Sequence, residues 1–127
     1  MKNREMNQIL KGLQLLEQCA FPIGITFAII KNKTDLEATL KPYKEAFAKA
    51  VEKYGAKDEE GMLMVDKNGN VQIPDTKSFL EEIEKLETID CSGITLQHVA
   101  FEEIMALDIS LTPEQLNALL SIADRRE

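Results

Sequence analysis

The chain has 127 residues, of which 44% are apolar and 29% charged, and this composition is typical of one soluble globular domain with a modest core. Its net charge of −7 argues against general nucleic-acid binding, because that affinity comes from neutralising many phosphates with lysine and arginine. The longest apolar stretch, residues 19–30, is shorter than the about 20 residues that span a membrane. From the length we expect a single domain over residues 1–127, and from the short apolar stretch no membrane association. The N-terminus does not read as a signal peptide, so we expect a cytoplasmic location.

A first helix is predicted over residues 3–19, where apolar residues recur every three or four positions. Phe21-Pro22 ends it, because proline is excluded from a helix interior but accepted in a first turn. A second, long helix is expected to start near Pro22 or Ile23 and to end before Gly55, a natural helix-ending residue. One face of this helix carries a roughly heptad apolar seam: Ile25, Ile29, Leu36, Leu40, Tyr43, Phe47 and Tyr54.

The length of this second helix bears on assembly. Pro42 would cost about 3 kcal/mol in an ordinary helix interior, so we expect a kink or a break there. A continuous helix of about 30 residues would instead be about 45 Å long, longer than a compact globule of this size. Part of the seam would then project and be covered by another chain, and this option predicts a homo-oligomer.

Residues 62–73 predict a β-hairpin, in which Asn68-Gly69 suits the two positive-φ positions of a type I′ turn. The segment that starts at Asp66 also resembles the beginning of an EF-hand calcium loop. Val71 stands where that loop needs glycine, however, and Lys77 stands where it needs a bidentate glutamate. We therefore predict a plain turn and no metal site.

A third helix is expected after the hairpin, capped by Asp75 or Thr76, with an apolar face that includes Phe79. Residues 94–101 alternate at first and predict a strand, and one option is that it lies beside the hairpin as a third strand. Thr112-Pro113 starts a last helix that is expected to run to about residue 124, and a glutamine three residues after Thr112 can close a capping box.

The predicted fold class follows from these elements. It is α+β and predominantly α, with a long helical hairpin, a small antiparallel β-hairpin or sheet, and two further helices.

Charge is distributed unevenly along the chain. Residues 1–55 carry nine basic and six acidic side chains, a balance of +3, whereas residues 56–127 have a balance of −10. The basic half could hold a small anion or meet the acidic half of a neighbouring copy, and the alternative is a solvated surface. The candidate ligand-binding residues on the long helix are Lys31, Asn32, Lys33, Lys41 and Lys44. Lysine tolerates varied anion geometry, but the simpler interpretation, which the sequence favours, pairs these lysines with Asp35, Glu37 and Glu45 along a solvated helix.

Other candidate chemistry is sparse. His98 is the only histidine, and neither it nor the nearby Glu102 and Glu103 forms a recognisable catalytic motif. Cys19 and Cys91 have no metal-binding spacing and are expected to be free thiols. We therefore expect no catalytic residues, no metal and no cofactor.

Several segments in chain order carry a resemblance: Phe27–Asn32, Glu52–Gly55, Lys57–Gly61, the Asn-Gly hairpin and Phe79–Leu86. This pattern resembles a loose group of small uncharacterised proteins encoded by phages and prophages. The resemblance implies a phage setting, in a bacterial host cell, and a helical, oligomeric accessory protein. It carries over no enzymatic residues.

Three functions are therefore open. The first is a non-enzymatic accessory protein that self-associates through its long helix and binds a partner. The alternative is an oligomer that sequesters an anionic nucleotide second messenger near Lys31 and Lys33 and so counters host defence. The third is an enzyme that uses His98.

Overall fold

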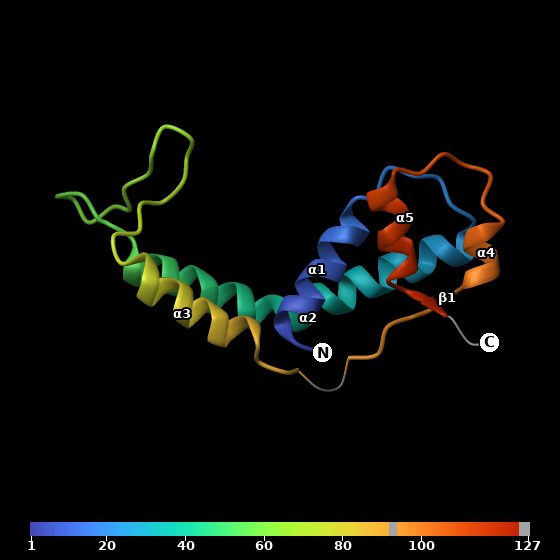
Figure 1. Ribbon diagram of the computed structural model, residues 1–127, viewed down its shortest axis with the longest axis horizontal. Helices are drawn as coiled ribbons and strands as arrows, with labels where there is room; N and C mark the ends of the chain where they lie inside the picture. Colours follow the sequence, from blue (N-terminus) through green and yellow to red (C-terminus); the bar gives the residue numbers. More distant parts are fainter. Residues whose placement is uncertain (92–93, 125–127) are drawn as a thin grey trace.

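The computed structural model describes residues 1–91 and 94–124, and over these residues it contains five helices and one two-stranded sheet. The fold is α+β and predominantly α, as predicted (Figure 1). The elements are α1 (Asn3–Gln14), α2 (Ile23–Tyr54), α3 (Thr76–Glu87), β1 (Val99–Ala100), α4 (Phe101–Met105), α5 (Pro113–Leu120) and β2 (Ala123–Asp124).

The molecule is elongated, and α2 runs through most of its length (Figure 1). At one end α1 and β1 pack on the first part of α2, α5 packs on α1, and α4 packs on α5 and the small sheet. We call residues 1–43 and 94–124 the body. At the other end α3 lies along the last part of α2, and we call residues 44–88 the arm. The body holds the larger buried cluster and the arm a smaller one.

Helix α2 is continuous through Pro42, so the expected break is wrong. Proline has no N–H and therefore removes one hydrogen bond to the carbonyl four residues earlier. The ribbon of α2 changes direction near its middle, which agrees with the expected kink (Figure 1). The helix survives there because residues on both sides of the proline are buried, Leu40 and Tyr43 among them.

The apolar seam of α2 is covered by the chain's own elements, and this corrects the expectation that a second copy covers it. Five seam residues belong to the core of the body, while Phe47 and Tyr54 are partly buried in the arm. Helix α1 packs on the seam in the body and α3 in the arm. The seam residues buried in the body are Ile25, Ile29, Leu36, Leu40 and Tyr43.

Helix α1 ends at Gln14 and not at residue 19, because the chain tightens into a turn held by bonds from Leu15 to Gly12 and from Leu16 to Leu13. Gly12 has a packing role. A Cβ on Gly12 would lie 3.1 Å from the Cβ of Ala118, so its absence lets α5 cross α1 closely. This close crossing offsets the low helix propensity of glycine.

Residues 56–73 form a small antiparallel meander of three extended segments, which projects from the end of the α2–α3 pair (Figure 1). The predicted hairpin is one half of it, with Val65 paired to Val71. The other half, which pairs Lys57 with Leu63, was not predicted. Three backbone hydrogen bonds join the extended segments in a ring. The Ala56 N–H donates to the Gln72 carbonyl, the Gln72 N–H to the Met64 carbonyl, and the Met64 N–H to the Ala56 carbonyl.

The two turns of the meander have the same structure, eight residues apart. In the first, Asp58 accepts backbone N–H bonds from Glu60 and Met62 through one side-chain oxygen, and Gly61 has φ of 82°. In the second, the Asp66 side chain accepts from Asn68 and Asn70, and Gly69 has φ of 83°.

The predicted type I′ turn is therefore wrong. Among the described residues only glycines have positive φ, so Asn68 does not adopt the conformation that a type I′ turn requires. Gly69 N–H donates to the Asp66 carbonyl, which closes a type I turn followed by a left-handed glycine.

Glycine is required at position 55 because a side chain would not fit there. Its backbone φ of −69° is one that any residue can adopt. A Cβ there would lie 2.6 Å from Leu63 and 3.0 Å from Val71. The base of the meander therefore packs directly onto the glycine backbone.

The C-terminal third of the chain differs most from the prediction. The strand expected over 94–101 is only β1, and it pairs in parallel with β2 rather than with the hairpin. The short helix α4 follows β1 and was not predicted. The capping box of Thr112 and Gln115 is confirmed, but α5 ends at Leu120 because the chain then extends into β2.

Candidate functional site

The five predicted ligand-binding residues of α2 do not form one site. Asn32 is fully buried, and its side-chain amide makes two bonds to the backbone of Gln97, donating to the carbonyl at 2.9 Å and accepting from the N–H at 2.7 Å. These bonds tie the segment before β1 to the middle of the body. Asn32 therefore has a structural role, because both ends of its amide are already occupied.

The lysines beside Asn32 point to different sides of α2. Lys31 pairs with Asp35 on the same helix at 3.1 Å, and Lys33 pairs with Glu17 in the turn after α1. Lys41 is exposed. Pairing along the helix, the simpler interpretation of the sequence, therefore holds for Lys31, whereas Lys33 pairs with a carboxylate from another segment.

Lys44 lies in a different place. It lines an open groove of about 450 Å³ between α1, α2 and the end of α3. Lys11 of α1 lines the same groove, and neither lysine forms an ion pair with a described residue. The other lining residues are Asn7, Tyr43, Phe47, Ala48 and Glu87.

Helix α2 carries a second apolar row on the side away from its seam. Ile23, Phe27 and Ile30 are 84%, 59% and 59% exposed, and their spacing of four and three residues places them on one face. A small hollow of about 150 Å³ lies beside the row, and Ile30 borders it together with Phe21. The row and the hollow form one surface, which we call the α2 patch.

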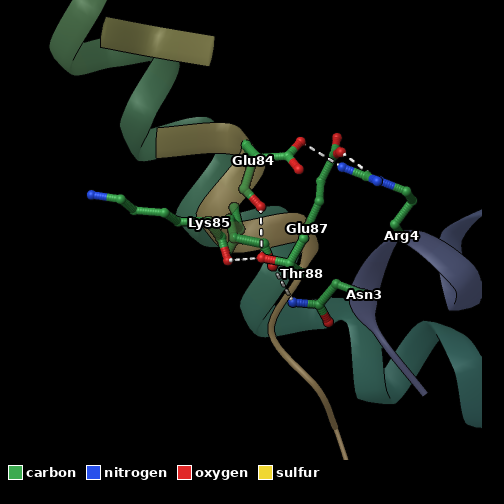
Figure 2. A network of polar contacts seen from close by, with 7 residues as sticks. Asn3, Arg4, Glu84, Lys85, Glu87 and Thr88 are labelled. Atoms are coloured by element: carbon green, nitrogen blue, oxygen red, sulfur yellow. Dashed lines mark hydrogen bonds and ion pairs between the residues drawn. The ribbon is translucent and has the colours of Figure 1, made fainter. Parts of the chain in front are cut away.

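The ends of α1 and α3 are joined by a polar network (Figure 2). Arg4 donates to Glu84 at 2.6 Å and to Glu87 at 3.1 Å, and these two carboxylates raise the pKa of the Arg4 guanidinium. The buried Asn3 donates to the carbonyl of Leu86 at 2.9 Å. Because Arg4 lies at the surface, we regard the network as an orienting contact between body and arm rather than a large source of stability.

A second polar contact joins α2 to α3 within the arm. Lys53 and the Tyr54 hydroxyl both donate to one oxygen of Glu82, each at 2.9 Å. The bonds from Lys53 and Tyr54 lower the pKa of Glu82, and the bond to Glu82 raises the pKa of Lys53.

Within residues 1–91 and 94–124, His, Cys, Asp and Glu side chains do not gather in groups of three that could hold a metal. His98 is exposed and makes no hydrogen bond or ion pair with a described residue. Cys19 and Cys91 are free and half-buried. Of the described helices, none is long and apolar enough to cross a membrane.

Comparison with family models, curated proteins and solved structures finds no match to this chain. Its candidate surfaces are therefore argued from their geometry alone. The sequence contained signals for two of them. Ile23, Phe27 and Ile30 form a helical row outside the seam, and Lys44 follows the buried Tyr43 directly.

Proposed function

We propose that this is a non-enzymatic binding protein that self-associates through the α2 patch. The observation that carries the proposal is the row of three large apolar side chains exposed beside an apolar hollow. Such contiguous apolar surface on a soluble protein marks an interaction site. The contact uses α2, as the sequence predicts, but on the side opposite the seam.

A second copy of the chain is the occupant that the patch fits. A two-fold contact places the same surface on both partners, so the row of one copy can enter the hollow of the other. Among the described residues that line the hollow, the charged ones are Lys33 and Glu17, and they form an ion pair with each other. Two copies can therefore approach there in spite of a net charge of −7 on each.

The expected dimer is weak. A standard protein interface buries about 800 Å² on each partner, which is more than three exposed side chains and a small hollow offer. We expect a dissociation constant on the order of micromolar.

Sedimentation velocity from low to high micromolar concentration tests self-association. The wild type should change from monomer to dimer, and Phe27→Asp should remain monomeric. Leu80→Asp is the matched control, since Leu80 is 56% exposed on α3, outside the patch, and this variant should dimerise like the wild type. A wild type that is monomeric at every concentration would refute the proposal.

The phage setting and the cytoplasmic location in a bacterial host are parts of this proposal that depend on the sequence pattern alone. The genomic neighbourhood tests them. A gene that lies among phage or prophage genes supports an accessory role with a partner encoded nearby, and a gene among housekeeping operons contradicts it.

The alternative, a second-messenger nucleotide held between Lys31 and Lys33, gains no support at those residues. The two lysines face different sides of α2 and have carboxylate partners, and Asn32 between them is buried.

A further inference from the structure

We propose that the groove between α1, α2 and the end of α3 binds a small phosphate-bearing molecule. Its walls bring together Lys11, Lys44, Asn7 and the edge of Tyr43 from two helices. This groove shares no residue with the α2 patch, so ligand binding in the groove can be tested independently of self-association.

Tyr43 provides the strongest observation. Its side chain is only 7% exposed, yet its hydroxyl makes no hydrogen bond with a described residue. Every fully enclosed side-chain polar atom of the described residues has a partner, so this hydroxyl must keep contact with solvent. Because Tyr43 lines the groove, the hydroxyl is available there for a ligand to bond.

Positive charge in the groove is also available. Lys11 and Lys44 come from α1 and α2 and have no carboxylate partner among the described residues. The one acidic residue in the groove, Glu87, already accepts a hydrogen bond from Arg4 at 3.1 Å. The groove therefore favours an anion, and lysine ammonium groups bind phosphate as mobile point charges.

The remaining walls favour an organic part on the ligand. Phe47 and Ala48 form an apolar side next to the lysines. A volume of about 450 Å³ lies within the range of about 300–1,000 Å³ that is usual for small-molecule sites. The ligand class is therefore a phosphate monoester with a planar or apolar group that can cover Phe47.

An NMR titration of the ¹⁵N-labelled protein tests this proposal with three probes: inorganic phosphate, adenosine monophosphate and adenosine. The monophosphate should cause saturable shifts at Asn7, Lys11, Lys44 and Phe47, phosphate should cause weaker shifts at the lysines, and adenosine should cause none. Lys11→Ala/Lys44→Ala should weaken monophosphate binding at least about tenfold. Lys41→Ala, an exposed lysine of α2 outside the groove, should bind like the wild type.

Tyr43→Phe gives the sharpest test. The hydroxyl has no hydrogen-bond partner among the described residues, so its removal should leave the melting temperature unchanged while it weakens monophosphate binding about fivefold. The proposal is overturned if neither phosphate compound causes saturable shifts, if adenosine binds as well as the monophosphate, or if the double lysine variant binds unchanged.

Discussion

The body and the arm share one helix but are stabilised in different ways. In the body, α1 and β1 pack on α2, α5 packs on the outer side of α1, and sixteen residues are buried in one cluster. In the arm, α3 alone covers α2, and three residues are buried: Ala50, Phe79 and Ile83. A continuous helix therefore does not have two equally stable ends, because burial of apolar area, and not helix length, provides most of the stability.

Aromatic contacts connect the two regions. Tyr43 of the body packs against Phe47 with ring centres 6.3 Å apart, and Phe47 packs against Phe79 at 6.1 Å. Phe79 in turn meets Tyr54 at 6.1 Å. Since such pairs add about 0.5–1.5 kcal/mol each beyond their buried area, this row of rings is a substantial part of what holds the arm.

The largest expected effect is in the body. Leu36 is fully buried, so Leu36→Ala should leave a cavity and lower the free energy of unfolding by about 4 kcal/mol. Chemical denaturation measures this loss, and the exposed neighbour variant Glu37→Ala should cost little. If hydrogen exchange accelerated in the body alone while the arm stayed protected, the arm would be stable without the core of the body, and the lower stability expected of the arm would be wrong.

A smaller and more local effect is expected in the arm. Phe79→Ala removes the ring that contacts both Phe47 and Tyr54, and we expect a loss of about 3 kcal/mol. Hydrogen exchange should accelerate in α3 and the end of α2 while the body remains protected. Leu80→Ala, at an exposed position of the same helix, is the control. Equal acceleration throughout the chain would mean that body and arm unfold as one unit.

The base of the meander should be sensitive to one methyl group. Gly55→Ala places a Cβ 2.6 Å from Leu63 and 2.7 Å from the carbonyl oxygen of Val51, and we expect a loss of about 2 kcal/mol that is confined to the last turn of α2 and residues 56–73. Gly24→Ala is the control, because nothing lies within 4 Å of its added Cβ. NMR shifts of the meander amides report the change, and unchanged shifts in Gly55→Ala would show that the close packing is absent in solution.

The smallest expected effect is a pH dependence of the arm. Lys53 and Tyr54 lower the pKa of Glu82 below its ordinary value of 4.5. A carboxylate with a lowered pKa in the folded state stabilises the protein above its unfolded pKa, and this contribution is lost as the pH falls through the folded pKa.

The protection factors of the α3 amides, which are corrected for the intrinsic pH dependence of exchange, should therefore decrease as the pH falls below about 4.5. Glu82→Gln should remove this dependence, whereas Glu81→Gln, at the exposed position beside it, should keep it. Identical pH profiles for the wild type and Glu82→Gln would show that the contact does not bias the arm.

Local chemistry made most of the helices predictable. The Asp75 cap, whose side chain accepts a bond from the Ser78 N–H, and the Thr112 capping box were visible because each needs only a few adjacent residues. The parallel pairing of β1 with β2 could not be predicted from the sequence. Two-residue strands that pair across more than twenty positions leave no periodic signal. Helix α4 is similarly too short for its periodicity to show.

The candidate site was harder to predict for a related reason. Asn32 lies three residues after Ile29 and four before Leu36, so the spacing of the seam places it inward. Its polarity suggested an exposed ligand-binding residue, whereas the structure satisfies it with the Gln97 backbone. A polar residue at a seam position indicates a buried partner, but the sequence does not show which distant backbone supplies that partner. The hydroxyl of Tyr43 illustrates the same limit, because only the structure shows that it has no hydrogen-bond partner within residues 1–91 and 94–124.

The ring of hydrogen bonds through Ala56, Met64 and Gln72 constrains how this chain can vary in length. Successive ring residues are eight positions apart, and the three extended segments that carry them close the ring. Deletion of one segment would therefore leave the other two with one unpaired donor and one unpaired acceptor. An added segment would have no place in a closed ring. Insertions should therefore be accepted only in the two turns outside the ring, between Glu59 and Glu60 or between Lys67 and Asn68, where they break the local bonds of Asp58 or Asp66 but leave the ring intact. These turns are the positions for a fluorophore or an affinity tag.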